Sequence, residues 1–119
     1  MEALLKRLEI RHLRLVQAIA GSGSLSAAAT GLHLTQSALS HQLKVLEETL
    51  AASLFHRHGK KMVITPTGQR VLAAAETILH ELGNMHTDLN NLKRGTDVCI
   101  RLATECYTAF HWLPRVIPL

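Results

Sequence analysis

Two helices joined by a short turn are predicted between residues 24 and 50, and no other feature constrains the fold of this chain as strongly. The first helix, 25–30, is rich in alanine, so it can lie close against a neighbour. The second begins after Thr35, whose hydroxyl can accept a hydrogen bond from a free amide of the first turn. Apolar residues at helical spacing between residues 10 and 20 supply a third helix, and three such stripes can close a small core.

The second helix of this pair has two chemically different faces. Its leucines recur at spacings of four, three and four, which places them on one side: Leu39, Leu43, Leu46 and Leu50. The other side carries neutral polar and basic residues in its first turns, namely Gln36, Ser37, Ser40, His41 and Lys44. Such a side is typical of a helix that reads base edges in a major groove, because no acid there repels phosphate. A solvated face without a partner is the alternative.

A basic hairpin is predicted directly after the helix pair. Residues 54–57 and 62–65 form two strand-like runs around a turn that contains glycine and two lysines. Such a hairpin commonly contacts the sugar-phosphate backbone, and its contribution depends on salt. Arg57, Lys60 and Lys61 are the candidates for these contacts. A hairpin that only covers the core is the alternative interpretation.

Positive charge is concentrated in the same part of the chain. Residues 1–61 contain eight lysines and arginines against four acidic residues, whereas residues 62–119 contain five of each. The net charge of +4 at pH 7 therefore falls on the segment that holds the helix pair and the hairpin. This distribution favours binding to a polyanion such as double-stranded DNA.

A long helix is predicted over residues 66–94, with Thr65 as its cap, Pro66 at its first position and Gly95 after its end. A helix of about 28 residues is roughly 42 Å long, which exceeds what a small domain can cover. We therefore expect its apolar stripe to pair with a second copy of the chain. The predicted dimer interface is Val71, Ala75, Ile78, Leu82, Met85, Leu89 and Leu92. A helix folded back on its own domain is the alternative.

The last part of the chain has a different pattern. One strand, 98–103, and one apolar helix cannot bury themselves, so we expect residues 96–119 to open an α/β domain whose remainder lies beyond this chain. Cys99 and Cys106 are too few for a disulfide framework and suit a reducing cytoplasm. No signal peptide or membrane span is evident, and we expect a cytoplasmic protein without a membrane partner.

Other classes of function leave weaker signals. An enzyme is disfavoured, because no glycine-rich phosphate loop, nucleophile elbow or paired acid and base occurs at useful spacing. A metal-sensing winged-helix repressor stays an alternative, since the eight histidines include His56 and His58 on alternate residues of a predicted strand. No tetrahedral ligand set is evident, so we predict no metal site. A winged helix that binds another protein is the remaining alternative.

Five separated motifs follow one another at regular intervals: 24–29, 32–43, 46–48, 54–57 and 65–68. In this order they resemble the amino-terminal part of LysR-type bacterial transcription regulators. The resemblance covers nearly the entire chain and implies a mainly α-helical fold. It places a winged helix-turn-helix with a two-stranded wing at 1–65, a linker and dimerisation helix at 66–95, and the first strand and helix of a truncated effector-binding domain at 96–119.

The resemblance also implies roles for single residues. Gln36, Ser37, Ser40 and His41 match the family's base-reading and phosphate-contacting positions, Ser26 matches a phosphate contact, and Arg57 with the following lysines matches the wing. With the two helix caps and Lys44, the candidate DNA-binding residues are Ser24, Ser26, Thr35, Gln36, Ser37, Ser40, His41, Lys44, Arg57, Lys60 and Lys61. Thr104 and Cys106 fall where effector contacts are often made.

Within the family, His41 and the segments 105–106 and 111–113 resemble regulators of methionine biosynthesis. That resemblance implies no cofactor but a small-molecule co-effector, homocysteine, bound by the missing effector domain. It also implies a dimer or tetramer on an interrupted palindrome and allows contact with RNA polymerase. The chain departs from the family pattern at Ala27, where a basic residue is common, at Ala51, where glycine is usual, and in its extended start.

Overall fold

The computed structural model describes residues 1–94 of the chain. The segment expected to open an effector-binding domain, with Thr104 and Cys106, lies outside the described residues. The first of two compact units spans Met1–His86 and is described here; of the second, only the end of the last helix is described. Among residues 1–94, no helix is both long enough and apolar enough to cross a membrane.

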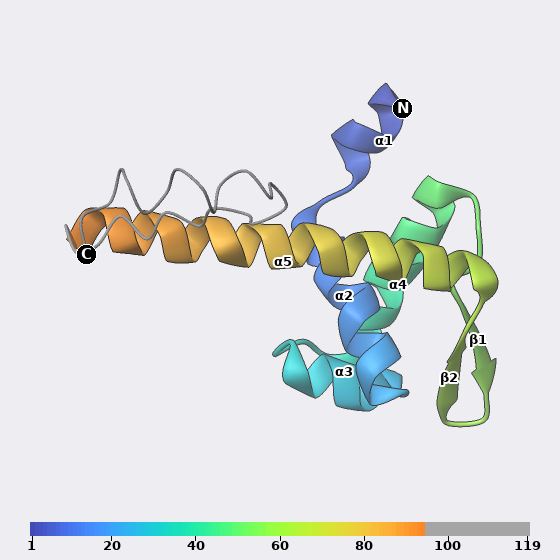
Figure 1. Ribbon diagram of the computed structural model, residues 1–119. Coiled ribbons are helices and arrows are strands. Elements are labelled where there is room, and N and C mark those ends of the chain that lie inside the picture. The colour runs from blue at the N-terminus through green and yellow to red at the C-terminus, as the bar shows by residue number, and fades with distance from the viewer. Residues whose placement is uncertain (95–119) are drawn as a thin grey trace, which may run out of the picture. The chain divides into compact units, whose positions relative to one another are not determined.

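Five helices and one hairpin make up the described chain (Figure 1). In order they are α1 (Glu2–Arg7), α2 (Ile10–Ser22), α3 (Leu25–Gly31), α4 (Gln36–Leu50), β1 (Phe55–His58), β2 (Lys61–Ile64) and α5 (Pro66–Arg94). The predicted class, mainly helical with a two-stranded wing and a long helix, is confirmed. Helix α1 is an addition, since the extended start had no predicted structure.

Side-chain hydroxyl groups cap the N-termini of three helices, as the sequence predicts. Ser24 Oγ accepts from the Ala27 amide at 3.1 Å, and Thr35 Oγ1 accepts from the Ala38 amide at 3.1 Å. Thr65 Oγ1 accepts from the amide of Gly68 at 2.9 Å, with Pro66 at the first helical position. Each bond satisfies an amide that has no partner within its own helix, and this defines where the helix begins.

The core lies where α2, α3 and α4 meet. Its fully buried side chains include Leu15, Val16 and Ile19 of α2, Leu39 and Leu46 of α4, and Leu54. The leucine face of α4 is therefore buried over Leu39, Leu43 and Leu46, and Leu50 is partly buried against the same cluster. Burial of each leucine contributes about 1.5–3 kcal/mol, so this face fixes the rotation of α4 about its axis.

The wing is a tight antiparallel hairpin. Phe55 pairs with Ile64 at its base and His58 pairs with Lys61 at its tip, which leaves Gly59 and Lys60 as the turn. Gly59 has φ +61°, as expected for a two-residue turn with glycine in the first central position. Strand β1 lies one residue later than the predicted run and β2 one residue earlier, and β2 ends before Thr65 because that residue caps α5.

The two turns that flank α4 contain left-handed residues other than glycine. His33, before α4, has φ 57°, and Ala51, after it, has φ 53° and ψ 38°. At the second turn the Ala52 amide bonds to the Glu47 carbonyl at 3.1 Å, which is the closing bond of a Schellman motif. A Cβ atom in this conformation is strained by about 1–2 kcal/mol, and glycine avoids the strain.

We therefore expect Ala51→Gly to raise the free energy of unfolding by about 1 kcal/mol, measured by urea unfolding. The matched control is Ala73→Gly, at an exposed position inside α5. There glycine should lower the free energy of unfolding by about 1 kcal/mol, because it weakens a helix interior. Equal changes in the two variants would contradict the assigned strain.

A histidine completes the start of α2. The Glu9 amide donates to His12 Nδ1 at 3.0 Å, and the Glu9 side chain accepts from the His12 amide, so the two residues form a capping box. His12 is only 3% exposed. Burial lowers the pKa of His12, with the nearby Glu9 carboxylate acting against it and the Arg11 guanidinium adding to it. The neutral imidazole is thus the form that the fold holds.

Stability should consequently fall in mild acid. The unfolded imidazole takes up a proton near pH 6.5, whereas the folded one does so only at lower pH, so this contribution is complete above about pH 6.5 and is lost as the pH falls toward the lowered value. In His12→Gln a neutral amide oxygen can still accept the Glu9 amide. Urea unfolding between about pH 7.5 and 5.5 should show a smaller loss in this variant than in the wild type; equal losses would contradict the assignment.

Candidate nucleic-acid interface

The polar side of α4 lies at the surface. Gln36, Ser37, Ser40, His41 and Lys44 are all exposed, while Leu39 and Leu43 on the other side are buried. Because the leucines must face the core, the packing leaves no other direction for the polar residues. The described structure therefore presents about two and a half turns of helix, Gln36 to Lys44, with an amide, two hydroxyls, an imidazole and an ammonium group facing outward.

This side of α4 borders a groove that reaches across to the wing. One hollow is lined by residues of the α3 start, the α4 start and the wing: Ser24, Leu25, Ser26, Gln36, Arg57, Lys60 and Met62. A second hollow continues along α4 and is lined by Leu25, Gln36, Ser37, Ser40, His41, Lys44 and Arg57. The two share Leu25, Gln36 and Arg57, and together we call them the α4–wing groove.

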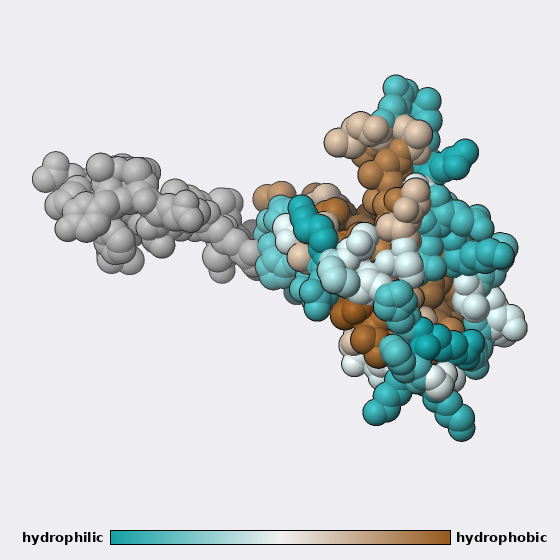
Figure 2. Space-filling view, turned by 90° about the vertical axis from the view of Figure 1, so that its right-hand side faces the viewer, coloured by the Kyte–Doolittle hydropathy of each residue, from teal (hydrophilic) through white to brown (hydrophobic). Residues whose placement is uncertain are grey.

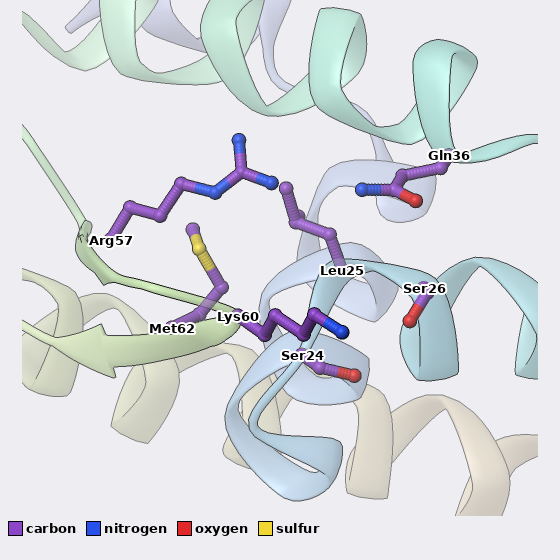
Figure 3. Close-up of a pocket in the computed structure, with 7 residues that line it drawn as sticks. All are labelled: Ser24, Leu25, Ser26, Gln36, Arg57, Lys60 and Met62. Carbon is purple, nitrogen blue, oxygen red and sulfur yellow. The ribbon is translucent and has the colours of Figure 1, made fainter.

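Side chains from three segments meet in this groove (Figure 3). Arg57 extends from the wing toward Leu25, and Gln36 extends toward the same leucine from the start of α4. Lys60 runs past Met62 in the direction of Ser24. Residues that are up to 38 positions apart in sequence, Ser24 and Met62, thus line one hollow.

The charged residues that line the groove are all basic. Lys44, Arg57 and Lys60 are permanent cations among its lining residues, and the lining contains no acidic residue within the described chain. Phosphate contacts are made by such cations and by hydroxyl groups, whereas base edges are read by amides and by arginine. Figure 2 shows hydrophilic side chains over most of the face that carries the wing, with apolar patches between them.

Three of the candidate residues have more restricted roles than their sequence position suggested. Ser24 and Thr35 use their oxygen lone pairs to cap helices, so toward a ligand each can offer its hydroxyl proton. Lys61 is exposed at the tip of the wing, where it pairs with His58, and it is not among the described residues that line the groove. Thr35 also does not line the groove, and the other predicted DNA-binding residues, Ser24 included, come together there.

Sequence reasoning missed two apolar residues of the site. Leu25 and Met62 form the part of the groove between the cations. Leu25 is 6% exposed, so most of its side chain belongs to the core. An apolar residue at the start of a helix gives no signal in sequence that one edge will remain in a groove.

A second candidate surface runs along α5. Val71 packs against the domain core and Ala75 is fully buried, so the first two predicted interface residues face their own domain. Beyond them the stripe is open: Ile78 is 41% exposed and Met85 is 51% exposed. Leu82 lies between these two and lines the same shallow apolar hollow on α5. Leu89 and Leu92, at 45% and 69%, continue the exposed stripe.

The histidines do not converge within the described part of the chain. His56 and His58 share the outward face of β1, opposite Val63 and Lys61. Among residues 1–94 there is no group of three or more histidine, cysteine, aspartate or glutamate side chains that could hold a metal ion. The geometry therefore gives the metal-sensing alternative no support from these residues.

Comparisons with known proteins agree with the geometry of the groove. A family model for bacterial regulatory helix-turn-helix proteins of the lysR family matches residues 10–69. The HTH-type transcriptional regulator MetR of Haemophilus influenzae is 40% identical over 106 residues, which are 89% of this chain and 34% of that protein. MetR of Buchnera aphidicola subsp. Schizaphis graminum is 42% identical over 112 residues, which are 94% of this chain and 35% of that protein.

The chain therefore spans about a third of the length of these two regulators. Among solved structures, a crystal structure of a BenM_DBD/catB site 1 DNA complex is similar with a TM-score of 0.72 and 29% identity. The similarity covers 77% of this chain and 99% of that chain. The matched family segment contains α3, α4 and the wing, which build the groove, and α2, which packs against α3 and α4 in the core.

Proposed function

The chain belongs to the lysR family of bacterial regulatory helix-turn-helix proteins, and from this premise we propose that it is the part of a transcription regulator that recognises double-stranded DNA. The single observation that carries the proposal is the α4–wing groove, in which the exposed side of α4 and the cations of the wing face the same space. A regulator of this kind performs no chemical conversion, and its function is selective binding.

Helix α4 would enter the major groove with its first turns. A helix fits that groove, and each base pair presents a distinct set of donors and acceptors there. Gln36 can bond an adenine through both ends of its amide, which is the pairing that glutamine makes with N6 and N7. Ser37, Ser40 and His41 follow on the same side, within reach of neighbouring bases or phosphates.

The wing would contact the backbone beside the helix. Arg57 and Lys60 line the groove, and Lys61 is exposed next to them. Phosphate contacts of this kind set the register of a protein on the duplex and make the affinity fall as the salt concentration rises. Ser26, exposed in the first turn of α3, would add a neutral phosphate contact from the opposite side of the hollow.

Two copies would act together through α5. The open stripe from Ile78 to Leu92 is too apolar to remain in water along its whole length, and a second α5 would cover it. A two-fold dimer presents two α4 helices and thus reads two half-sites of an interrupted palindrome, about one helical turn apart. A tetramer in the complete protein would pair two such dimers.

The regulated pathway would be methionine biosynthesis. The similarity to two regulators named MetR supports this, together with the resemblance of His41 and of segments 105–106 and 111–113 to that group. Homocysteine would then be the co-effector, bound by an effector domain of which 96–119 are the first residues, with Thr104 and Cys106 as contacts. The chain would work in the cytoplasm, and contact with RNA polymerase would follow DNA binding.

A substitution at Gln36 tests the base-reading role. We expect Gln36→Ala to weaken binding to a selected operator by about 1–3 kcal/mol, with little change on random DNA, because an amide that reads a base adds no sequence-independent affinity. Lys44→Ala is the matched control on the same side of α4. It should weaken binding to both duplexes alike and lower the salt slope by about one, as loss of a phosphate contact does.

Binding of both variants to both duplexes is measured by fluorescence anisotropy over a range of potassium chloride concentrations. Equal loss on operator and random DNA in Gln36→Ala would refute base reading by this residue. Failure of the wild type to prefer any duplex would refute the proposed function as a whole.

A substitution on α5 tests the dimer. Ile78→Glu should raise the dissociation constant of the dimer by about 10–100-fold, because two isoleucines leave a buried interface and two like charges meet there. Ala73→Glu, about 200° around the helix from Ala75, is the control and should leave the dimer intact. Sedimentation equilibrium measures both constants. A monomeric wild type at tens of micromolar, or a dimer unaffected by Ile78→Glu, would contradict this assembly.

A further inference from the structure

An acidic residue of α4 holds the first residues of the wing. Glu47 lies eleven residues beyond Gln36 on the same helix and is partly buried. Its Oε1 atom accepts from the Leu54 amide at 2.8 Å and from the Phe55 amide at 3.4 Å. Its backbone carbonyl also accepts from the Ala52 amide at 3.1 Å. One residue of α4 therefore bonds to both the turn that follows the helix and the strand that begins the wing.

The negative charge of Glu47 is unfavourable for a helix that is proposed to bind DNA. A carboxylate on a helix that faces a polyanion weakens the attraction between the two, and Glu47 is one of only two acids in α4. A carboxylate that accepts from backbone amides makes charge-assisted bonds, which are shorter and roughly twice as strong as neutral ones. A neutral side chain at this position would therefore hold the wing less firmly.

The bonds of Glu47 act close to Arg57. Leu54 is fully buried and Phe55 is 6% exposed, so the core fixes the two residues whose amides donate to Glu47. Arg57 follows Phe55 by two residues in β1, which places the two side chains on the same face of the strand, about 7 Å apart along it. Because both residues belong to one strand, the position of Phe55 determines the position of Arg57. Arg57 in turn lines the groove together with Gln36.

Other bonds hold the wing to different elements. The Thr65 amide bonds to the Leu54 carbonyl at 2.9 Å, and the Thr65 hydroxyl bonds to the Ser53 carbonyl at 2.7 Å, which tie the wing base to the start of α5. The Met62 amide bonds to the Gly23 carbonyl at 2.9 Å, which ties β2 to the turn before α3. Glu47 supplies the side-chain link from the wing to α4 itself.

We infer that Glu47 is a positioning residue for DNA binding: its carboxylate sets the wing against α4 so that Arg57 and Gln36 engage one duplex. Glu47 itself makes no contact with DNA in this arrangement. The inference rests on the proposed function, because it assigns Glu47 a part in the same binding surface. It differs from a general role in folding, which would not depend on whether Arg57 is present.

A double-mutant cycle between Glu47 and Arg57 separates these two roles. We expect Arg57→Ala to weaken duplex binding about tenfold and to lower the salt slope by about one. Glu47→Ala should do the same, and the double variant should bind no more than about twofold more weakly than Arg57→Ala alone. Glu47→Gln should fall between wild type and Glu47→Ala, because its amide oxygen still accepts but carries no charge.

Urea unfolding of each variant shows which fraction is folded, and affinities are compared at equal folded concentration. If Glu47→Ala does not fold, the cycle is carried out with Glu47→Gln. Effects of the two substitutions that multiply would overturn the inference, and so would wild-type binding by Glu47→Ala. It would likewise be overturned if Arg57→Ala bound as the wild type does, since Glu47 would then have no cation to position.

Hydrogen exchange gives a readout that does not require DNA. In Glu47→Ala the Met62 amide, on the far strand of the wing, should exchange about tenfold faster than in the wild type, and in Glu47→Gln by a smaller factor, while the Leu39 amide in α4 keeps its rate in both. If the wild type binds no duplex, the proposed function fails, and this measurement still decides whether Glu47 holds the wing. An unchanged Met62 rate in a folded variant would overturn the inference.

Discussion

Burial of the leucine side of α4 is the interaction on which the rest of the site depends. Leu39, Leu43 and Leu46 are each at most 6% exposed, and together their burial contributes several kcal/mol of stability. A rotation of the helix that exposed them would lose that contribution and would bury hydrophilic groups without partners. The outward direction of Gln36 and Ser40 is thus a consequence of the core, and the binding surface requires no further device to hold it open.

The groove adds to this a second element, the wing, that comes from a separate part of the chain. Its position is fixed at its base by Leu54 and Phe55 in the core and by the bonds from Glu47 and Thr65. The wing supplies most of the positively charged side chains of the site, whereas α4 supplies the groups that are able to read bases. This division separates affinity, which depends on phosphate contacts and salt, from specificity, which depends on base edges.

Much of the fold could be predicted from local patterns. The caps Ser24, Thr35 and Thr65, the leucine spacing of α4 and the run after Pro66 each depend on neighbours within four residues, and each gave the correct element. Features that depend on distant partners could not be predicted in this way. The bonds of Glu47 to the wing and the proximity of Arg57 to Gln36 arise only when the turn at Ala51 directs the chain back along α4. The helix α1 and the capping box of His12 also had no recognised pattern, since histidine is unusual at that capping position.

Selection of duplexes from a random pool by the intact chain tests the central claim most directly. If the polar side of α4 reads bases, the bound sequences should converge on a short motif repeated with two-fold symmetry. Binding to the selected duplex should then exceed binding to random DNA by about 10³-fold or more at moderate salt. A pool that shows no enrichment, with an affinity that depends only on salt and not on sequence, would contradict the account, because net charge alone explains such binding.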